Sequence, residues 1–206
     1  MIAEFQRADR PRSMTVAEYL AWEATQPTKH EYLNGVAYEM AGGTLAHNDL
    51  ALNLYSLLRS RVRDRGCRVN VADAKVRVSA AGPYFYPDLV VSCDDRDRQA
   101  IDVISYPQLI AEVLSPSTAA LDRGDKFRYY RRLPTLTEYL LIDAEKVGVD
   151  RYTKTSGGKW ELTTYPDDVA DQDQACLVLS GLDLICPLAL IYEGVNLAGD
   201  QNENAG

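Results

Sequence analysis

The chain is poor in the residues from which most metal and nucleophilic sites are built. Its 206 residues include only two histidines, His30 and His47, and four cysteines without a CxxC pair. A zinc site would need clustered His and Cys ligands, which this spacing does not offer. The sequence has no GxSxG elbow and no glycine-rich phosphate loop followed by Lys-Ser/Thr. These absences exclude serine hydrolases of the elbow type and P-loop nucleotide hydrolases.

Long apolar runs are also missing. No stretch approaches the roughly 18 consecutive apolar residues that a membrane-spanning helix needs, and the opening segment MIAEFQRADRPRS is polar. We therefore expect a cytoplasmic protein with no membrane partner. In a reducing compartment buried free thiols are expected rather than disulfides, and this expectation covers Cys67, Cys93, Cys176 and Cys186.

Positive charge is scarce overall, with 22 basic against 30 acidic residues and a net charge of −8. A negative balance is unfavourable for nucleic-acid binding, because phosphate neutralisation usually supplies much of the affinity. Ten of the basic residues nevertheless lie in two short stretches, 59–68 and 123–132. A locally basic face is therefore feasible, although two solvated helix faces explain the same residues equally well.

The remaining composition is that of an ordinary globular domain, with 46% hydrophobic and 25% charged residues. The length suits one domain, which we place at residues 14–193. A flexible N-terminal arm over residues 1–13 and a flexible C-terminal tail over residues 194–206 flank it.

Helix and turn signals organise the first third of the chain. Thr15 is a plausible N-cap with Glu18 three residues later, which predicts a helix from about residue 14. Asn34-Gly35 predicts the tight turn of a hairpin over residues 31–40. Leucines at helical spacing predict a second helix over 47–65, where His47 is expected to cap the helix or to contact a phosphate, capping being the safer expectation.

The middle of the chain predicts a mixed α/β sheet. The expected core order is helix, three strands, helix and strand, because strand-like runs at 69–78, 84–92 and 109–114 precede a helix ending near 133 and a strand at 138–143. A strand–helix–strand step favours a parallel crossover. A C-terminal β-hairpin over 147–165, an acidic loop at 167–174 and a last strand at 177–179 complete the prediction.

Two acids interrupt otherwise apolar strands. Asp88 follows Tyr86-Pro87 and precedes Leu89-Val90-Val91, and Glu112 lies inside the apolar run 109–114. A buried carboxylate needs a compensating partner, and two acids on neighbouring strands form a hard-oxygen site suited to Mg²⁺ or Mn²⁺. The alternative, an ion pair of each acid with an Arg on a covering helix, is equally compatible with the residues.

A cation near these acids would favour catalysis. Leu114 occupies the position on the same strand face as Glu112, so the next candidate is Lys126 on the following helix. Asp122 lies four residues before Lys126, and the two could simply pair on the helix surface. Glu31, at the start of the hairpin, reads alone as an ordinary surface glutamate.

Together these segments resemble the PD-(D/E)XK nuclease superfamily and, more narrowly, its Uma2-type family of bacterial restriction endonucleases, with a restriction-endonuclease-like core. The matching stretches span residues 14–193. They include His30-Glu31-Tyr32-Leu33-Asn34-Gly35, Tyr86-Pro87-Asp88, Glu112-Val113-Leu114-Ser115-Pro116-Ser117-Thr118 and Asp122-Arg123-Gly124-Asp125-Lys126.

The resemblance implies roles for four residues. Asp88 and Glu112 would hold a Mg²⁺ or Mn²⁺ ion, Lys126 would replace the superfamily's strand lysine, and Glu31 would be an auxiliary acid. Leu114, where a lysine is typical, departs from the superfamily pattern. The implied reaction is phosphodiester hydrolysis in DNA, and a homodimer is expected by the same resemblance.

Two other functions stay open at this stage. A nuclease-fold protein that no longer cleaves would act as a binding or regulatory module and would take up no metal at Asp88 and Glu112. A glycosidase that uses two carboxylates would place both acids in an aromatic-lined cleft and would remain active in EDTA.

Overall fold

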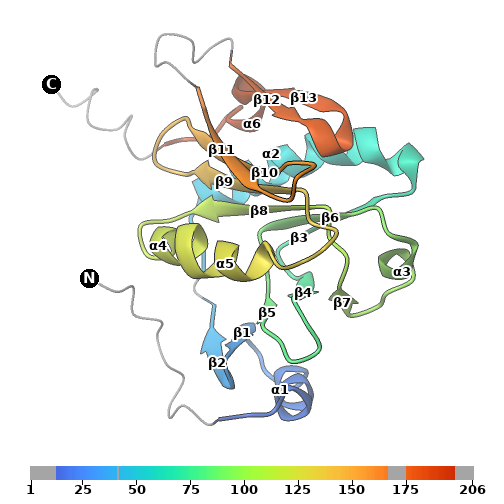
Figure 1. The fold of residues 1–206 in the computed structure, drawn as a ribbon. Helices are drawn as coiled ribbons and strands as arrows, with labels where there is room; N and C mark the ends of the chain where they lie inside the picture. The colour runs from blue at the N-terminus through green and yellow to red at the C-terminus, as the bar shows by residue number, and fades with distance from the viewer. Residues whose placement is uncertain (1–12, 41, 167–174, 198–206) are drawn as a thin grey trace, which may run out of the picture.

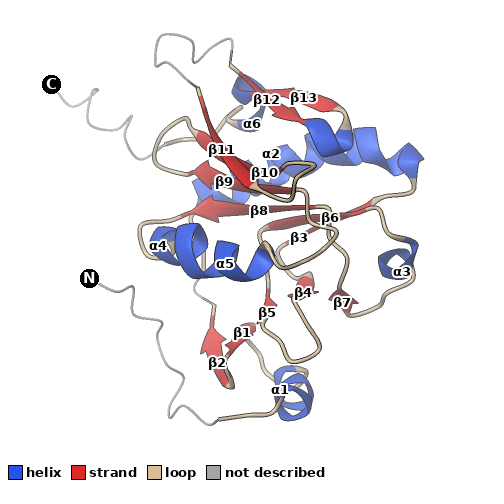
Figure 2. Ribbon diagram, in the orientation of Figure 1, coloured by secondary structure: helices blue, strands red, loops and turns tan. Residues whose placement is uncertain are grey.

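The computed structural model describes residues 13–40, 42–166 and 175–197. Nearly all of the predicted N-terminal arm, the acidic loop at 167–174 and most of the predicted C-terminal tail lie outside the described residues. Helices and strands form a mixed α/β fold around two larger sheets and a small C-terminal hairpin (Figures 1 and 2). None of the helices in the described ranges combines the length and apolarity needed to cross a bilayer.

The central sheet has six strands in the order β11-β10-β9-β8-β6-β3. Its strands are β3 (Arg68–Val71), β6 (Leu89–Ser92), β8 (Leu109–Leu114), β9 (Glu138–Asp143), β10 (Val149–Lys154) and β11 (Trp160–Tyr165). β8 and β9 pair in parallel, whereas the other neighbours pair antiparallel. The predicted mixed sheet and its strand–helix–strand crossover are confirmed.

Helices cover both faces of this sheet. On one face lies α2 (Leu45–Val62), continued by a 3₁₀ turn (Arg63–Arg65). On the other face, α4 (Ala119–Leu121), a π-helical turn (Asp122–Lys126) and α5 (Phe127–Tyr130) form one segment, which ends before the predicted residue 133 (Figure 1).

Strand β8 shows how the sheet separates two cores. Leu109, Ala111 and Val113 pack with the buried leucines of α2. Ile110 and Leu114 pack in a second cluster with Tyr130 of α5. Glu112 has the even-numbered parity and therefore faces α5 and the π-helical turn.

A five-stranded sheet of order β2-β1-β5-β4-β7 lies beside the central one. Its strands are β1 (His30–Leu33), β2 (Val36–Glu39), β4 (Lys75–Arg77), β5 (Tyr84–Phe85) and β7 (Val103–Ile104). The predicted hairpin turn is confirmed, because Asn34 and Gly35 have φ of 51° and 84°, the left-handed values that a type I′ turn requires. The Thr15–Glu18 capping box is also present and begins α1 (Val16–Glu23).

Two predicted strands are wrong as single elements. The run 69–78 breaks at Ala72, which has a φ of 55°, and becomes β3 and β4 in different sheets. The run 84–92 breaks between β5 and β6 at Tyr86-Pro87-Asp88, where Pro87 offers no N–H to a ladder. Asp88 therefore lies at the junction of the two sheets, one residue before β6.

The C-terminal region differs from the predicted single strand. It forms a hairpin of β12 (Cys176–Leu179) and β13 (Leu184–Pro187), with a 3₁₀ turn (Ser180–Leu182) between them and α6 (Leu188–Ile191) after them. Val195 and Leu197, which the sequence assigns to the tail, pack with the core beneath α2. The short helix α3 (Asp95–Arg98) was not predicted either.

The expectation of four free thiols is wrong for one pair. Cys67 and Cys93 form a disulfide. They flank the paired residues Arg68 and Ser92 of β3 and β6, so the antiparallel register places them directly opposite each other. Sequence spacing could not reveal this, because the 25 residues between them include β3, β4, β5 and β6 and the turns that join them. Cys186 is a buried thiol, and burial raises its pKa to about 11.

Candidate functional site

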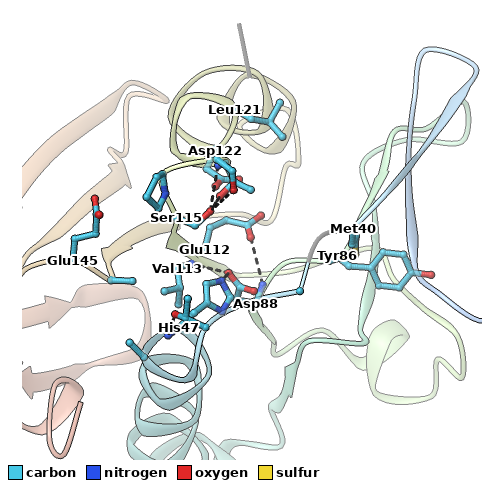
Figure 3. A pocket seen from close by; sticks show the side chains of 18 of the residues that line it. Met40, His47, Tyr86, Asp88, Glu112, Val113, Ser115, Leu121, Asp122 and Glu145 are labelled. Atoms are coloured by element: carbon cyan, nitrogen blue, oxygen red, sulfur yellow. Dashed lines mark hydrogen bonds and ion pairs between the residues drawn. The ribbon is translucent and has the colours of Figure 1, made fainter. Parts of the chain in front are cut away.

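Four acidic side chains and one lysine converge on a cavity of about 1280 Å³. They come from separate segments: Glu31 from β1, Asp88 from the sheet junction, Glu112 from β8, and Asp122 and Lys126 from the π-helical turn. Figure 3 shows Glu112 lying between Asp88 and Asp122. All four residues that the sequence singled out as a candidate site thus lie together.

Lys126 is the centre of this group. Its Nζ lies 3.0 Å from Glu31 Oε1, 3.3 Å from Glu112 Oε1 and 3.3 Å from Asp122 Oδ1. The ammonium group is almost fully buried, although it is carried by a helical segment. Lys126 reaches Glu112 over the sheet, and it also pairs with Asp122, although this pair is buried and does not lie on the helix surface as the alternative expected.

Glu112 is held by three groups. The Tyr130 hydroxyl donates to Oε1 at 3.1 Å, Lys126 contacts the same oxygen, and the Asp88 amide donates to Oε2 at 3.4 Å. Burial raises the pKa of Glu112 well above its ordinary value, although the Lys126 charge acts against it. The alternative to a metal site was an ion pair with an Arg on a covering helix, and for Glu112 a Lys on that helix forms the ion pair instead.

Asp88 is the more accessible acid, with about 20% of its side chain exposed. The Val113 amide donates to Asp88 Oδ2 at 2.7 Å, and His47 Nε2 lies 3.3 Å from the same oxygen. Figure 3 shows the His47 ring beside Asp88. The hydrogen bond to Asp88 is the main cause that raises the pKa of His47, and partial burial acts against it.

The expectation that His47 caps its helix is wrong. α2 begins at Leu45, and the N-cap is Thr44, whose hydroxyl accepts from the His47 amide at 3.2 Å. The imidazole is consequently available to Asp88. The capping expectation failed because the helix starts two residues earlier than the leucine periodicity indicated.

Charge in the group is unbalanced. Four carboxylates face one ammonium, which leaves three negative charges if all are ionised. Burial raises the pKa of Glu31 and of Asp122, with Lys126 acting against it in both cases. Burial alone would lower the pKa of Lys126, but Glu112, Glu31 and Asp122 outweigh it and hold that pKa well above its usual range. A cation in the cavity would relieve this excess.

The donor set fits a magnesium-like ion with a partly water-filled shell. Asp88 and Glu112 offer hard carboxylate oxygens at the cavity wall, and the nearby buried Asp122 Oδ1 is paired with Lys126 Nζ at 3.3 Å. Within that part of the chain, no group of three or more His, Cys, Asp or Glu could hold an ion by itself. Mg²⁺ commonly keeps several waters and takes only one or two carboxylates, so two ligands suffice.

Sequence reasoning missed three contributors. Asp122 was considered only as a surface partner, His47 only as a cap or phosphate contact, and Tyr130 not as part of the acid group. Residues 122, 126 and 130 repeat at a spacing of four, which places them on one helical face. Applied to the segment after Glu112, this spacing could have found Asp122 and Tyr130. His47 lies one turn before the leucine stripe of its helix, but this spacing does not reveal Asp88 as its partner.

The neighbouring residues settle two further expectations. Leu114, at the superfamily's usual lysine position, is buried in the apolar cluster with Tyr130. In the basic stretch 123–132, Lys126 is buried, whereas Arg123, Arg128, Arg131 and Arg132 are exposed. Arg123 pairs with Asp150 at 2.6 Å, so at least one member of this stretch is neutralised locally.

The fold and the acid–lysine group define a protein of the restriction-endonuclease-like class. Consistent with this, the Uma2 family, described as "Putative restriction endonuclease", matches residues 16–188. The chain belongs to that family.

Relatives and a solved structure extend this finding. Two uncharacterized proteins of Synechocystis sp. are similar to the chain. One is 37% identical over 195 residues, 95% of this chain and 99% of the relative, and the other is 39% identical over 155 residues, 73% and 86% respectively. The fold resembles the crystal structure of a "putative nuclease" from Anabaena variabilis, with a TM-score of 0.68 and 15% identity over 87% of this chain and 97% of that chain.

Proposed function

We propose that this protein is an endonuclease that hydrolyses phosphodiester bonds in DNA and depends on Mg²⁺ or Mn²⁺. The observation that carries the proposal is the convergence of Asp88, Glu112 and Lys126 in one cavity, from segments that lie far apart in the sequence. Membership in the Uma2 family supports nuclease chemistry over a two-carboxylate glycosidase.

Each residue has a distinct task in this reaction. Asp88 and Glu112 would hold the ion, which would supply Lewis-acid polarisation of the scissile phosphate and lower the pKa of a water. Lys126 places a permanent positive charge at the cavity, where it stabilises the negative charge that develops on phosphorus oxygens and orients the attacking water. Glu31 positions the lysine, since its carboxylate accepts the shortest of the three contacts of Nζ, at 3.0 Å.

Lys126 is held protonated by its neighbours, because the acids raise its pKa. It therefore serves as an electrostatic donor in the resting protein rather than as a base. The proton of the attacking water would therefore leave to solvent in the cavity, because Lys126 is already protonated. The structure supports charge stabilisation as its main role.

The test is cleavage of supercoiled and linear DNA by the purified full chain with Mg²⁺, Mn²⁺ or EDTA. Asp88→Asn and Glu112→Gln are expected to lower cleavage by roughly 100-fold or more, because several kcal/mol of charge stabilisation disappear. Glu145→Gln is the matched control: it removes a charge from an exposed residue at the cavity rim and should cleave like wild type. Unchanged cleavage in the Asp88 and Glu112 variants would reject the proposal.

A catalytically inactive DNA-binding or regulatory module is the second candidate. It is favoured by the ion pairing of Glu31, Glu112 and Asp122 with Lys126 and by the small number of ligands that the described residues offer an ion. This module would bind DNA but take up no Mn²⁺ in calorimetry. The homodimer expected from the superfamily stays a prediction, which analytical ultracentrifugation would test.

A further inference from the structure

His47 lies on the face of α2 that packs against the sheet, and it has no role in the proposed reaction. Leu50, Leu54 and Leu58 form the apolar stripe of the helix, and His47 continues this stripe by one turn toward its N-terminus. His47 and Asp88 both line the cavity. The His47 ring therefore contacts the Asp88 carboxylate and not an apolar side chain.

The backbone of Asp88 is held by the Ala72 amide, which donates to its carbonyl at 3.0 Å, but this backbone contact does not orient the carboxylate. It lies between β5 and β6, outside both strands, and its side chain is partly exposed. The two contacts that hold its carboxylate are the Val113 amide and His47 Nε2, and both fall on Oδ2. None of the hydrogen bonds among the described residues falls on Oδ1, which is left for a ligand.

The imidazole is fixed from its other side as well. A Cβ built on Gly43 would lie 2.8 Å from His47 Nδ1, closer than real Cβ contacts allow. The ring thus sits between the Gly43 backbone and the Asp88 carboxylate. With Nδ1 against Gly43, Nε2 is the nitrogen that faces Asp88, and a hydrogen on it donates to Oδ2.

We propose that His47 is a positioning residue for the metal ligand Asp88: its Nε2–H and the Val113 amide clamp Oδ2, so that Oδ1 is presented to a divalent cation in the cavity. This inference rests on the proposed function, since it assumes a cation at Asp88. Groups that orient a metal ligand typically change metal affinity by roughly 10- to 100-fold when they are removed.

The experiment titrates the full chain with Mn²⁺ alone, by calorimetry and by the electron paramagnetic resonance signal of the free ion. His47→Leu removes the donor and is expected to weaken Mn²⁺ binding by roughly 10- to 100-fold. His47→Gln carries an N–H on a side chain of similar reach and should restore affinity to within a few fold of wild type. A purely structural role for the ring would not be rescued in this way.

Two substitutions separate positioning from helix stability. Gly43→Ala leaves the imidazole intact but forces the ring to move, so it should weaken Mn²⁺ binding as His47→Leu does. Thr44→Ala removes the N-cap and should lower the melting temperature while leaving Mn²⁺ affinity within about twofold. Circular dichroism of each variant shows whether it is folded.

The outcomes distinguish this inference from the proposed function. One outcome is that wild type binds Mn²⁺ and Asp88→Asn abolishes binding, but His47→Leu and Gly43→Ala bind as tightly as wild type. The positioning role of His47 is then wrong, whereas the proposed function stands. Equal weakening by His47→Leu and His47→Gln would also overturn the positioning role, because the donated N–H would not matter. If wild type takes up no Mn²⁺, or Asp88→Asn leaves uptake unchanged, both the proposed function and the positioning role fail.

Discussion

Lys126 Nζ and Glu112 Oε1 lie 3.3 Å apart, although one is carried by a helical turn and the other by the middle of a buried strand. In this chain the positive charge of the site comes from outside the sheet. The strand position that shares the face of Glu112 holds Leu114, which belongs to the apolar core. The lysine therefore lies over the acids and is surrounded by three of them.

Replacing Lys126 by methionine should destabilise the metal-free protein at neutral pH by about 3–5 kcal/mol. The reason is that three buried carboxylates lose their counter-charge. Urea denaturation measures the change, and Arg128→Met, an exposed substitution on the same segment, is the matched control. A loss below about 1 kcal/mol would show that the buried acids are neutral without the lysine.

Replacing Tyr130 by phenylalanine should cost about 1.5–3 kcal/mol, the usual range for a buried hydrogen bond to a charged group. The Tyr130 hydroxyl donates to Glu112 Oε1 at 3.1 Å in a fully buried environment. Tyr129→Phe removes a long contact with Asn34 from the neighbouring, half-buried tyrosine and should cost little. Equal losses in the two variants by chemical denaturation would contradict this assignment.

The buried side chain of Glu138, which lies outside the candidate site, should make the stability of the protein depend on pH. It is fully buried in β9, and burial raises its pKa above the ordinary 4.5, although the charge of Arg151 acts against this. Because the folded state holds the proton more tightly than the unfolded state, stability falls as the pH rises from about 4.5 to the folded-state pKa.

Glu138→Gln cannot ionise and should lack this decline. The stability of wild type relative to the variant is therefore expected to decrease with rising pH, measured as melting temperatures between pH 4.5 and 8. Glu161→Gln, at an exposed position of β11, should follow wild type at every pH. If the stability of wild type relative to Glu138→Gln stays constant or increases with rising pH, ionisation of Glu138 does not destabilise the folded protein.

The Cys67–Cys93 disulfide should stabilise the oxidised protein by about 3.5 kcal/mol, since it closes a loop with a sequence separation of 26 residues. A Cys67→Ser/Cys93→Ser double variant should melt at a lower temperature than oxidised wild type. Reductant should bring wild type down to the level of the variant and leave the variant unchanged. A melting temperature of wild type that does not respond to reductant would contradict the bond.

The sequence was sufficient to predict those strands, turns and caps whose structure depends only on residues adjacent in the chain. β8 and β9 have the predicted bounds, because the run 109–114 and the run 139–142 are largely apolar and each lies in a buried strand. The Asn34-Gly35 turn and the Thr15 cap also depend on adjacent residues only. Membership in the Uma2 family and the grouping of Asp88, Glu112, Lys126 and Glu31 were expected from motifs.

Contacts between distant segments could not be read in the same way. The runs 69–78 and 84–92 were predicted as continuous strands, but each crosses from one sheet to the other, with breaks at Ala72 and at Pro87. Pro87 is a local signal for its break, whereas no local signal marks Ala72. The Cys67–Cys93 bond follows from a strand register, and the contact between His47 and Asp88 from the docking of α2 against the sheet.

The amino-acid sequence by itself thus determined the bounds of β8 and β9, the Asn34-Gly35 turn, the Thr15 cap and the family, and it singled out the residues proposed to hold a metal. The tertiary structure decided which of them touch: it placed Asp88 at a sheet junction, surrounded Lys126 with three acids and added Asp122, Tyr130 and His47 to the group. The physical reason is the distance along the chain over which each interaction acts. Periodicity and capping act over a few residues, whereas buried charges select their partners through space once the sheet and its covering helices are packed.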